Sequence, residues 1–235
     1  MSLFAVGDLH LPGGQDKPMN VFGAQWTDHF RQIADSWRQE VGPGDTVLIP
    51  GDISWAMRPE EARADLEEIA ALPGRKVMIR GNHDYWWNGI QRVRGMLPEG
   101  FFALQQDALD LGEAVVCGTR GWMIPTGDAP LEEHDLKIYR REVGRLEAAL
   151  REAGKLAGQR PVVVMLHYPP AMQHQRTSGF TESMERAGAR MCVYGHLHGA
   201  GIASAFQGIQ GGVEYVLTSC DSLKFRVKKL TFYNK

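Results

Sequence analysis

Aspartate, asparagine and histidine residues follow short apolar runs at five places along the chain. These places are Asp8-Leu9-His10, Gly51-Asp52, Gly81-Asn82-His83-Asp84, His167 and Gly195-His196-Leu197-His198. Carboxylate oxygen, amide oxygen and imidazole nitrogen, with no thiolate among them, suit borderline-to-hard divalent cations such as Mn, Fe or Zn. Seven of these side chains are too many for one tetrahedral metal and fit two metals that share a ligand. The residue types therefore predict a site for two divalent ions.

The expected charge of this site explains how the chain could bind an anionic substrate. Asp8 and Asp52 are the carboxylates of the set, so two divalent ions leave it with a charge of about +2, or about +1 with a bridging hydroxide. Such a site attracts phosphate and can stabilise an in-line displacement at phosphorus. We therefore predict phosphate chemistry although the net charge of the chain is -2.

The elements that carry the first three motifs are predicted to form a parallel sheet. Short buried strands alternate with helices whose apolar residues repeat every three or four positions. The expected strands are 3–7, 45–50 and 75–79, and the expected helices are 26–41, 59–72 and about 85–97. In a sheet with helical crossovers, the loops at the carboxyl ends of the strands form the ligand crevice. The motifs occupy these loops.

The second half of the chain has a more mixed pattern. Residues 101–104 and 114–117 are expected to be neighbouring strands of a hairpin or meander, and residues 131–156 a long helix. Buried strands are expected at 161–166 and 191–194, and a closing run of antiparallel strands at 202–206, 213–217 and 225–230. No repeat or linker interrupts the chain. We therefore predict a single domain over residues 1–235.

The ordered motifs resemble those of the calcineurin-like metallophosphoesterase superfamily, whose pattern is D-x-H, G-D, G-N-H-[DE], H and G-H-x-H. Every element is present between positions 8 and 198, and the chain is most similar to small bacterial predicted phosphohydrolases. The resemblance implies an α/β fold of two facing mixed β-sheets flanked by helices, a four-layer αββα sandwich. It also implies hydrolysis of a small-molecule phosphate mono- or diester by attack of a metal-bound hydroxide.

The resemblance further implies a role for each motif residue. One metal would be bound by Asp8, His10 and His198, the other by Asn82, His167 and His196, with Asp52 bridging both. His83 would protonate the leaving oxygen as a general acid, and Asp84 would orient His83.

One motif departs from the pattern of two branches of the superfamily. Protein phosphatases and diadenosine tetraphosphatases continue the second motif as G-D-x-x-D-R-G, whereas this chain reads Gly51-Asp52-Ile53-Ser54-Trp55-Ala56-Met57-Arg58. The missing arginine argues against phosphoprotein substrates. Arg120, beside Trp122, is our candidate for a phosphate contact, and Arg58 and Arg80 are weaker ones.

Several aromatic residues directly follow the ligand loops, among them Trp55, Tyr85, Trp86 and Trp87. Two interpretations are open. The rings could pack the loops against helices, or they could form a stacking wall for a nucleobase or an aromatic alcohol. In the second case, Trp55 and Trp86 would contact substrate.

Composition excludes several other classes of protein. The 26 basic and 28 acidic residues argue against binding nucleic acid or an anionic membrane by bulk charge. The sequence leaves two alternative functions open. A nuclease of the same superfamily is one alternative, although a basic groove is not evident.

A non-catalytic protein-binding scaffold is a second alternative, but such scaffolds typically lose ligands and this chain has them all. We therefore favour a small phosphorylated substrate, and the sequence leaves the oligomeric state open.

The cysteines and apolar runs indicate the cellular compartment. The three cysteines lie far apart and form no CxxC pair, which favours a reducing cytoplasm. The start of the chain lacks the features of a signal peptide, and the longest purely apolar run is Val162–Leu166. We therefore expect a cytoplasmic protein that does not span a membrane.

Overall fold

The computed structural model describes residues 1–15, 17–127 and 130–232, and it divides into two compact units. The first unit comprises Met1–Ala103 and the C-terminal residues from Thr218, and the second comprises Leu104–Leu217. Each unit contains one mixed β-sheet flanked by helices, of five strands in the first and six in the second. The expected α/β fold with two mixed sheets is therefore confirmed. The single domain stays a prediction that limited proteolysis would test.

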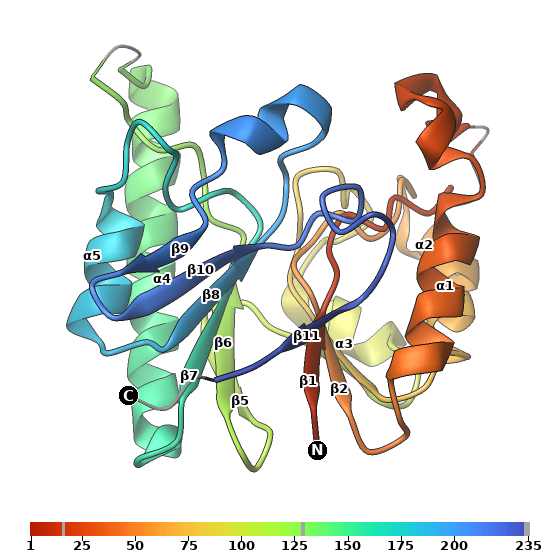
Figure 1. Cartoon of the computed structure of the whole chain (residues 1–235), viewed down its shortest axis with the longest axis horizontal. Helices are drawn as coiled ribbons and strands as arrows, with labels where there is room; N and C mark the ends of the chain where they lie inside the picture. Colours follow the sequence, from red (N-terminus) through yellow and green to blue (C-terminus); the bar gives the residue numbers. More distant parts are fainter. Residues whose placement is uncertain (16, 128–129, 233–235) are drawn as a thin grey trace. The chain divides into compact units, whose positions relative to one another are not determined.

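The sheet of the first unit has the strand order β11-β1-β2-β3-β4. Figure 1 labels β11, β1 and β2 of this sheet. Its parallel strands are β1 (Leu3–Ala5), β2 (Thr46–Ile49), β3 (Arg75–Met78) and β4 (Phe101–Ala103), and β11 (Lys228–Leu230) pairs antiparallel with β1 at the edge. The helices are α1 (His29–Glu40), α2 (Pro59–Ala70) and α3 (Ile90–Met96), with short 3₁₀ helices η1 (Met19–Phe22) and η2 (Ala24–Trp26) before α1. The predicted alternation of strands and helices thus holds in this unit.

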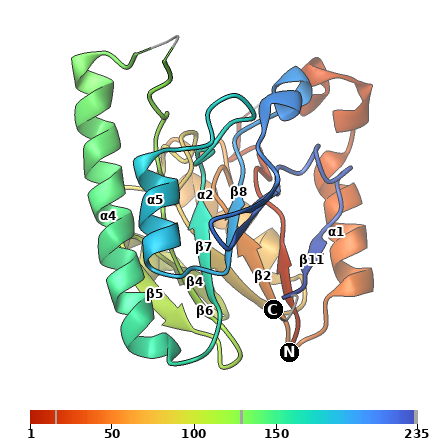
Figure 2. The same cartoon turned by 60° about the vertical axis from the view of Figure 1, so that its left-hand side comes forward.

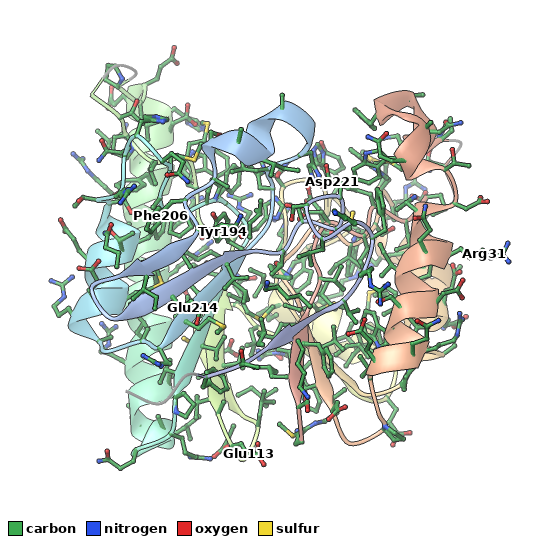
Figure 3. The ribbon with its side chains drawn as sticks, in the orientation of Figure 1. Arg31, Glu113, Tyr194, Phe206, Glu214 and Asp221 are labelled. Carbon is green, nitrogen blue, oxygen red and sulfur yellow. The ribbon has the colours of Figure 1, made fainter. Side chains whose placement is uncertain are left out.

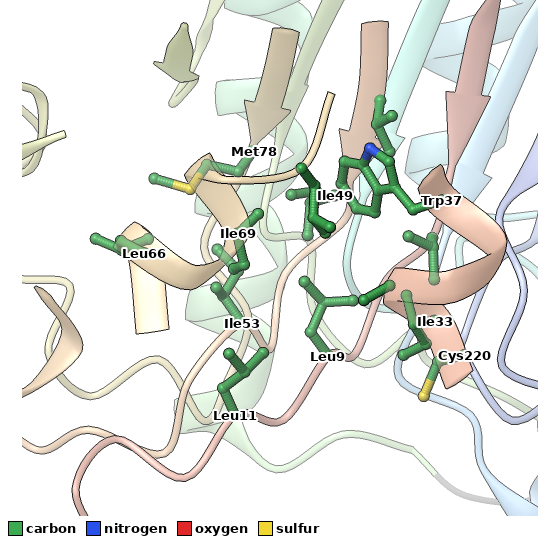
Figure 4. Close-up of a cluster of buried hydrophobic side chains, with 14 of the residues drawn as sticks. Leu9, Leu11, Ile33, Trp37, Ile49, Ile53, Leu66, Ile69, Met78 and Cys220 are labelled. Carbon is green, nitrogen blue, oxygen red and sulfur yellow. The ribbon is translucent and has the colours of Figure 1, made fainter. Parts of the chain in front are cut away.

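The core of the first unit lies between its helices and its sheet (Figure 4). Ile33 and Trp37, four residues apart on α1, are fully buried, as is Ile49 of β2. The Trp37 indole N–H donates to the carbonyl of Pro73 at 2.8 Å, so this large side chain is buried with its polar atom satisfied. Pro59 occupies the first position of α2, where its missing N–H costs no hydrogen bond.

The sheet of the second unit has the order β5-β6-β7-β8-β10-β9. Its strands are β5 (Asp107–Asp110), β6 (Val115–Thr119), β7 (Val162–Leu166), β8 (Met191–Tyr194), β9 (Gly208–Gln210) and β10 (Val213–Leu217). The four central strands are parallel, and β5 and β9 pair antiparallel at the edges. The helices α4 (Glu133–Ala157) and α5 (Gly179–Arg186) lie side by side (Figure 2).

One buried contact of this unit joins strand β8 to the loop after the 3₁₀ helix η3 (Gly199–Ser204). The Tyr194 hydroxyl donates to the carbonyl of Phe206 at 2.6 Å, and both residues are labelled in Figure 3. Burial also raises the pKa of Tyr194, so the phenol keeps its proton, and this hydrogen bond, to a higher pH than an exposed tyrosine would.

Three expectations about local structure are wrong. Residues 101–104 and 114–117 do not form a hairpin, because β4 pairs with β3 in the first sheet and β6 pairs with β5 and β7 in the second. Residues 202–206 lie mainly in η3 rather than in a strand, and β10 pairs parallel with β8. Strand β5 was not expected, because two of its four residues are aspartates, which are rare in strands.

The helix expected from about residue 85 begins only at Ile90. The residues before it form a loop in which the Asp84 carboxylate accepts hydrogen bonds from the Gly81 N–H and from the Trp86 indole. These bonds compete with helix formation and delay the start of α3.

Among the residues that the structure describes, no helix combines the length and the apolar character that crossing a bilayer requires.

Candidate functional site

The first ligand set consists of Asp8, His10, Asp52 and Asn82, which follow the adjacent parallel strands β1, β2 and β3. The backbones of the first two loops remain paired beyond the strands. The Asp8 N–H donates to the carbonyl of Gly51, and the His10 N–H donates to the carbonyl of Asp52, both at 3.0 Å. Asp52 therefore lies beside Asp8 and His10 at one edge of the sheet, although more than 40 residues separate it from them in the sequence.

Most residues of this set have an unusual backbone conformation. Asp8, His10 and Asp52 have φ values of 58°, 47° and 50°, in the left-handed region that side chains other than glycine rarely adopt. His196, from the second unit, has a φ of 74°. Each such residue costs about 1–3 kcal/mol, and such strain clusters at functional sites. Four expected ligands are thus among the eight described non-glycine residues with positive φ.

The two carboxylates of the first set are buried close to each other. Asp8 is 0% exposed and Asp52 is 2% exposed. One oxygen of Asp8 lies within 4.8 Å of an oxygen of Asp52, and also within 4.8 Å of a ring nitrogen of His10. The Nε2 atom of His10 is 3.9 Å from Oδ2 of Asp52. Two ionised carboxylates at this separation repel each other, and a cation bound beside them would offset that repulsion.

The third loop approaches Asp52 so closely that only glycine fits at position 81. A Cβ atom at Gly81 would lie 2.1 Å from Oδ1 of Asp52 and 2.2 Å from its backbone nitrogen. The same Oδ1 accepts the His83 N–H at 2.8 Å. Asp52 therefore connects the second loop to the third, and its Oδ2 is the oxygen on the His10 side.

Asp84 fastens the same two loops together. Its Oδ1 accepts the backbone N–H of Ile53 at 2.9 Å and that of Ser54 at 3.2 Å, and its Oδ2 accepts the N–H of Gly81 at 2.7 Å. With the Trp86 indole as a fourth donor, this fully buried carboxylate is well satisfied. The structure thus gives Asp84 a role in holding the loops. Its expected role in orienting His83 stays a prediction.

His83 lies among aromatic residues. Its ring centroid is 4.3 Å from that of Trp55 and 5.9 Å from that of His10. The Tyr85 hydroxyl lies 3.4 Å from Nδ1 of His83. The phenol oxygen can accept a hydrogen bond from a protonated Nδ1 or donate one to an unprotonated Nδ1.

The structure distinguishes between the tryptophans near the ligand loops. Trp86 and Trp87 are 0% and 1% exposed, which favours the packing role that the sequence left open for them. Trp55 is partly exposed, and its ring stacks on His10 with centroids 5.1 Å apart. Of the two proposed substrate contacts, Trp55 is therefore the accessible one.

The second ligand set consists of His167, His196 and His198, which follow the adjacent parallel strands β7 and β8. Nε2 of His167 and Nδ1 of His196 lie 3.3 Å apart. The Gly195 N–H donates to the carbonyl of His167 at 3.1 Å, which fixes the two loops against each other. His198 is the residue that precedes η3. Two imidazole nitrogens this close can bind one cation together.

Arg120, the candidate phosphate contact, lies at the same edge of the second sheet. It follows β6, and its carbonyl accepts the N–H groups of His167 and Tyr168, both at 3.0 Å. Its guanidinium carbon lies 4.6 Å from the ring centroid of Trp122, a cation–π contact that holds the side chain. The ring of Tyr168 packs between those of Trp122 and His196, at 5.1 Å and 4.2 Å.

Three supporting residues had no recognisable signal in the sequence. Nε2 of His29, at the start of α1, hydrogen-bonds the carbonyl of Leu9 at 2.8 Å, and burial lowers the pKa of this imidazole. The Cys220 thiol donates to the carbonyl of Asp8 at 3.0 Å. Asp65 of α2 accepts the Gly13 N–H at 2.8 Å and the Ser54 hydroxyl. Each contact joins residues far apart in sequence, and a motif search depends on local spacing.

The donors present in the two sets fit divalent cations. They are carboxylates, one amide and imidazoles, and the buried pair Asp8 and Asp52 favours positive charge nearby. The hydrogen bonds of Asp52 Oδ1 and of the loop backbones preorganise the donors, as outer-shell partners do in metal sites.

Comparisons with known proteins agree with this chemistry. A model of the calcineurin-like phosphoesterase family matches residues 1–200. The gene 66 protein of Mycobacterium phage L5 is 25% identical over 199 residues, which cover 85% of this chain and 78% of that protein.

Two solved structures have the same fold. The phosphopantetheinyl hydrolase PptH from Mycobacterium tuberculosis has a TM-score of 0.56 and 15% identity, with 97% of this chain and 95% of that chain covered. TT1561 of Thermus thermophilus has a TM-score of 0.55 and 14% identity, with 98% of both chains covered. Because the family model spans most of its length, the chain belongs to the calcineurin-like phosphoesterase family.

Proposed function

We propose that the protein is a phosphoesterase that uses two divalent metal ions to hydrolyse a small-molecule phosphate mono- or diester. Membership of the family supports a metal-dependent phosphoesterase. We further propose that the two ligand sets together hold two ions, and that these ions are Mn, Fe or Zn.

The buried carboxylate pair is the observation that carries this proposal. Asp8 and Asp52 are 0% and 2% exposed and have positive φ, and their oxygens approach within 4.8 Å. Backbone strain and two close carboxylates at one point favour a bound divalent cation, whose charge would offset their repulsion.

In this proposal each residue of the site has one task. Asp8, His10 and His198 would hold one ion, Asn82, His167 and His196 would hold the other, and Asp52 would be shared by both. Bound ions supply positive charge for the phosphate oxygens and lower the pKa of a coordinated water.

His83 is the proton donor of the proposed reaction. Its Nε2 protonates the departing ester oxygen, which would otherwise leave as an alkoxide. The proton donor is the imidazolium form; after the transfer the neutral ring keeps its other proton on Nδ1, where the Tyr85 oxygen, 3.4 Å away, can accept a hydrogen bond from it. Trp55 limits the rotation of the imidazole by packing against it.

The experiment is removal and return of metal. Protein treated with a chelator and verified to be metal-free should lose hydrolysis of p-nitrophenyl phosphate and bis-p-nitrophenyl phosphate, and Mn should restore it. Circular dichroism before and after treatment controls for unfolding. Full activity in a verified metal-free, folded sample would contradict the proposal.

A further inference from the structure

A cavity of about 590 Å³ lies in the first unit between α1, α2 and the segment that contains η1 and η2. Its lining begins at the expected metal ligand His10 and extends to Arg38 of α1 and Glu68 of α2. None of the motif residues other than His10 lines it. The cavity therefore adjoins the first ligand set and extends away from it.

The wall of the cavity is mainly apolar. The apolar lining residues are Leu11, Pro12, Pro18, Met19, Trp26, Phe30 and Ala34. Trp26 is held in place, because its ring packs edge-on against Phe225 with centroids 5.1 Å apart and lies 6.2 Å from the ring of His10. This part of the wall is preformed and favours an apolar ligand surface.

The charged residues of the lining nearly cancel. Lys17, Arg31 and Arg38 oppose Asp28 and Glu68, and all five are exposed. Arg31 points away from α1 (Figure 3). Arg38 lies 3.3 Å from Asp35. These residues of opposite charge would therefore add little binding free energy for a second charged group on the ligand.

We propose that this cavity binds the alcohol portion of the phosphate ester, and that this portion is an apolar group larger than a phenyl ring. The inference rests on the proposed function, since it places the phosphate at the ligand set that includes His10. A volume of about 590 Å³ is in the range that encloses small-molecule ligands and is too small for a folded partner. Trp55, stacked on His10 with Lys17 4.4 Å above its ring, marks the boundary between the two parts of the substrate.

The test uses 4-alkylphenyl phosphates, in which the chain length changes and the acidity of the leaving phenol stays nearly constant. In the wild-type protein, kcat/KM should rise with chain length from phenyl to butylphenyl and hexylphenyl phosphate. Complete burial of each added methylene would raise kcat/KM by at most about fourfold. A gain of about twofold or more per methylene is the expected result.

Variants locate the effect in the cavity. Thr27→Trp places a large ring at an exposed position of the lining, and Ala34→Leu adds volume on α1. Both should reduce the ratio of kcat/KM for hexylphenyl over phenyl phosphate by at least about tenfold. Gln39→Trp is the matched control, because Gln39 is exposed on the same helix and outside the lining, and it should leave the ratio unchanged.

Binding of phosphonates separates this inference from the proposed function. Hexylphosphonate should bind the wild type more tightly than methylphosphonate in calorimetry, and Thr27→Trp should remove the difference. If binding follows this pattern while no ester is hydrolysed, the cavity assignment stands and the proposed function fails. Hydrolysis without any effect of chain length, or a preference for nucleoside monophosphates, would overturn the inference.

Discussion

Replacement of Gly81 by alanine tests whether the third loop must touch Asp52. The added Cβ would lie 2.1 Å from Oδ1 of Asp52, and real Cβ contacts under 3.0 Å are essentially never seen. The carboxylate must therefore move by about 0.9 Å, the difference between 3.0 and 2.1 Å. Metal–ligand distances tolerate about 0.2 Å, so the shift exceeds what a bridging ligand can absorb.

The backbone nitrogen of Asp52 is 2.2 Å from the same point, so rotation of the side chain alone cannot relieve the contact. Overpacking of this kind costs about 1–3 kcal/mol of folding free energy. We expect Gly81→Ala to fold with a lowered Tm, to bind less than one equivalent of metal and to lose at least about a hundredfold in kcat.

The assay combines elemental analysis of metal content, thermal unfolding and hydrolysis of p-nitrophenyl phosphate. Gly89→Ala is the matched control, because a Cβ at Gly89 meets nothing within 4 Å. It should keep metal and activity. A Gly81→Ala protein with two equivalents of metal and normal kcat would refute the reasoning about Asp52.

Three further predictions follow from individual side chains. His83→Ala should keep its metal and lose far more activity on alkyl phosphates than on p-nitrophenyl phosphate, because a poor leaving group needs the proton; an equal loss on both would contradict the general-acid role. Trp86→Phe removes a hydrogen-bond donor to the Asp84 carboxylate and should lower the free energy of unfolding in urea by about 1.5–3 kcal/mol, with KM unchanged. A raised KM would instead place Trp86 in the substrate site. Burial lowers the pKa of Lys76 to about 8, so between pH 8 and about 10.4 the unfolded chain holds a proton on Lys76 that the folded chain has lost. The contribution of Lys76 to stability should therefore rise with pH, and the free energy of unfolding of the wild type minus that of Lys76→Met, from urea titrations, should increase over this range. A constant difference would contradict the lowered pKa.

The sequence predicts the ligand loops well because each ligand follows a short, buried strand. Glycines next to Asp52 and Asn82 mark the tight approach that the structure shows at Gly81. Parallel strands align their carboxyl ends, so the order of the motifs in the chain is enough to bring Asp8 beside Asp52.

Features that depend on tertiary contacts could not be predicted in this way. Strand β5 pairs with β6 although Asp107 and Asp110 give it the composition of a loop. The delayed start of α3 arises from the hydrogen bonds that Asp84 accepts. The cavity near His10 lies between residues of α1, residues 10–12 and 17–20, and Glu68 of α2, and the spacing within one helix carries no information about a space between segments.

The stoichiometry of bound metal tests the central claim most directly. Metal-free wild-type protein titrated with Mn should bind two equivalents per chain, Asp52→Ala should lose both, and Asn82→Ala should lose mainly one. Two equivalents bound by Asp52→Ala with unchanged affinity would contradict the shared ligand on which the account depends.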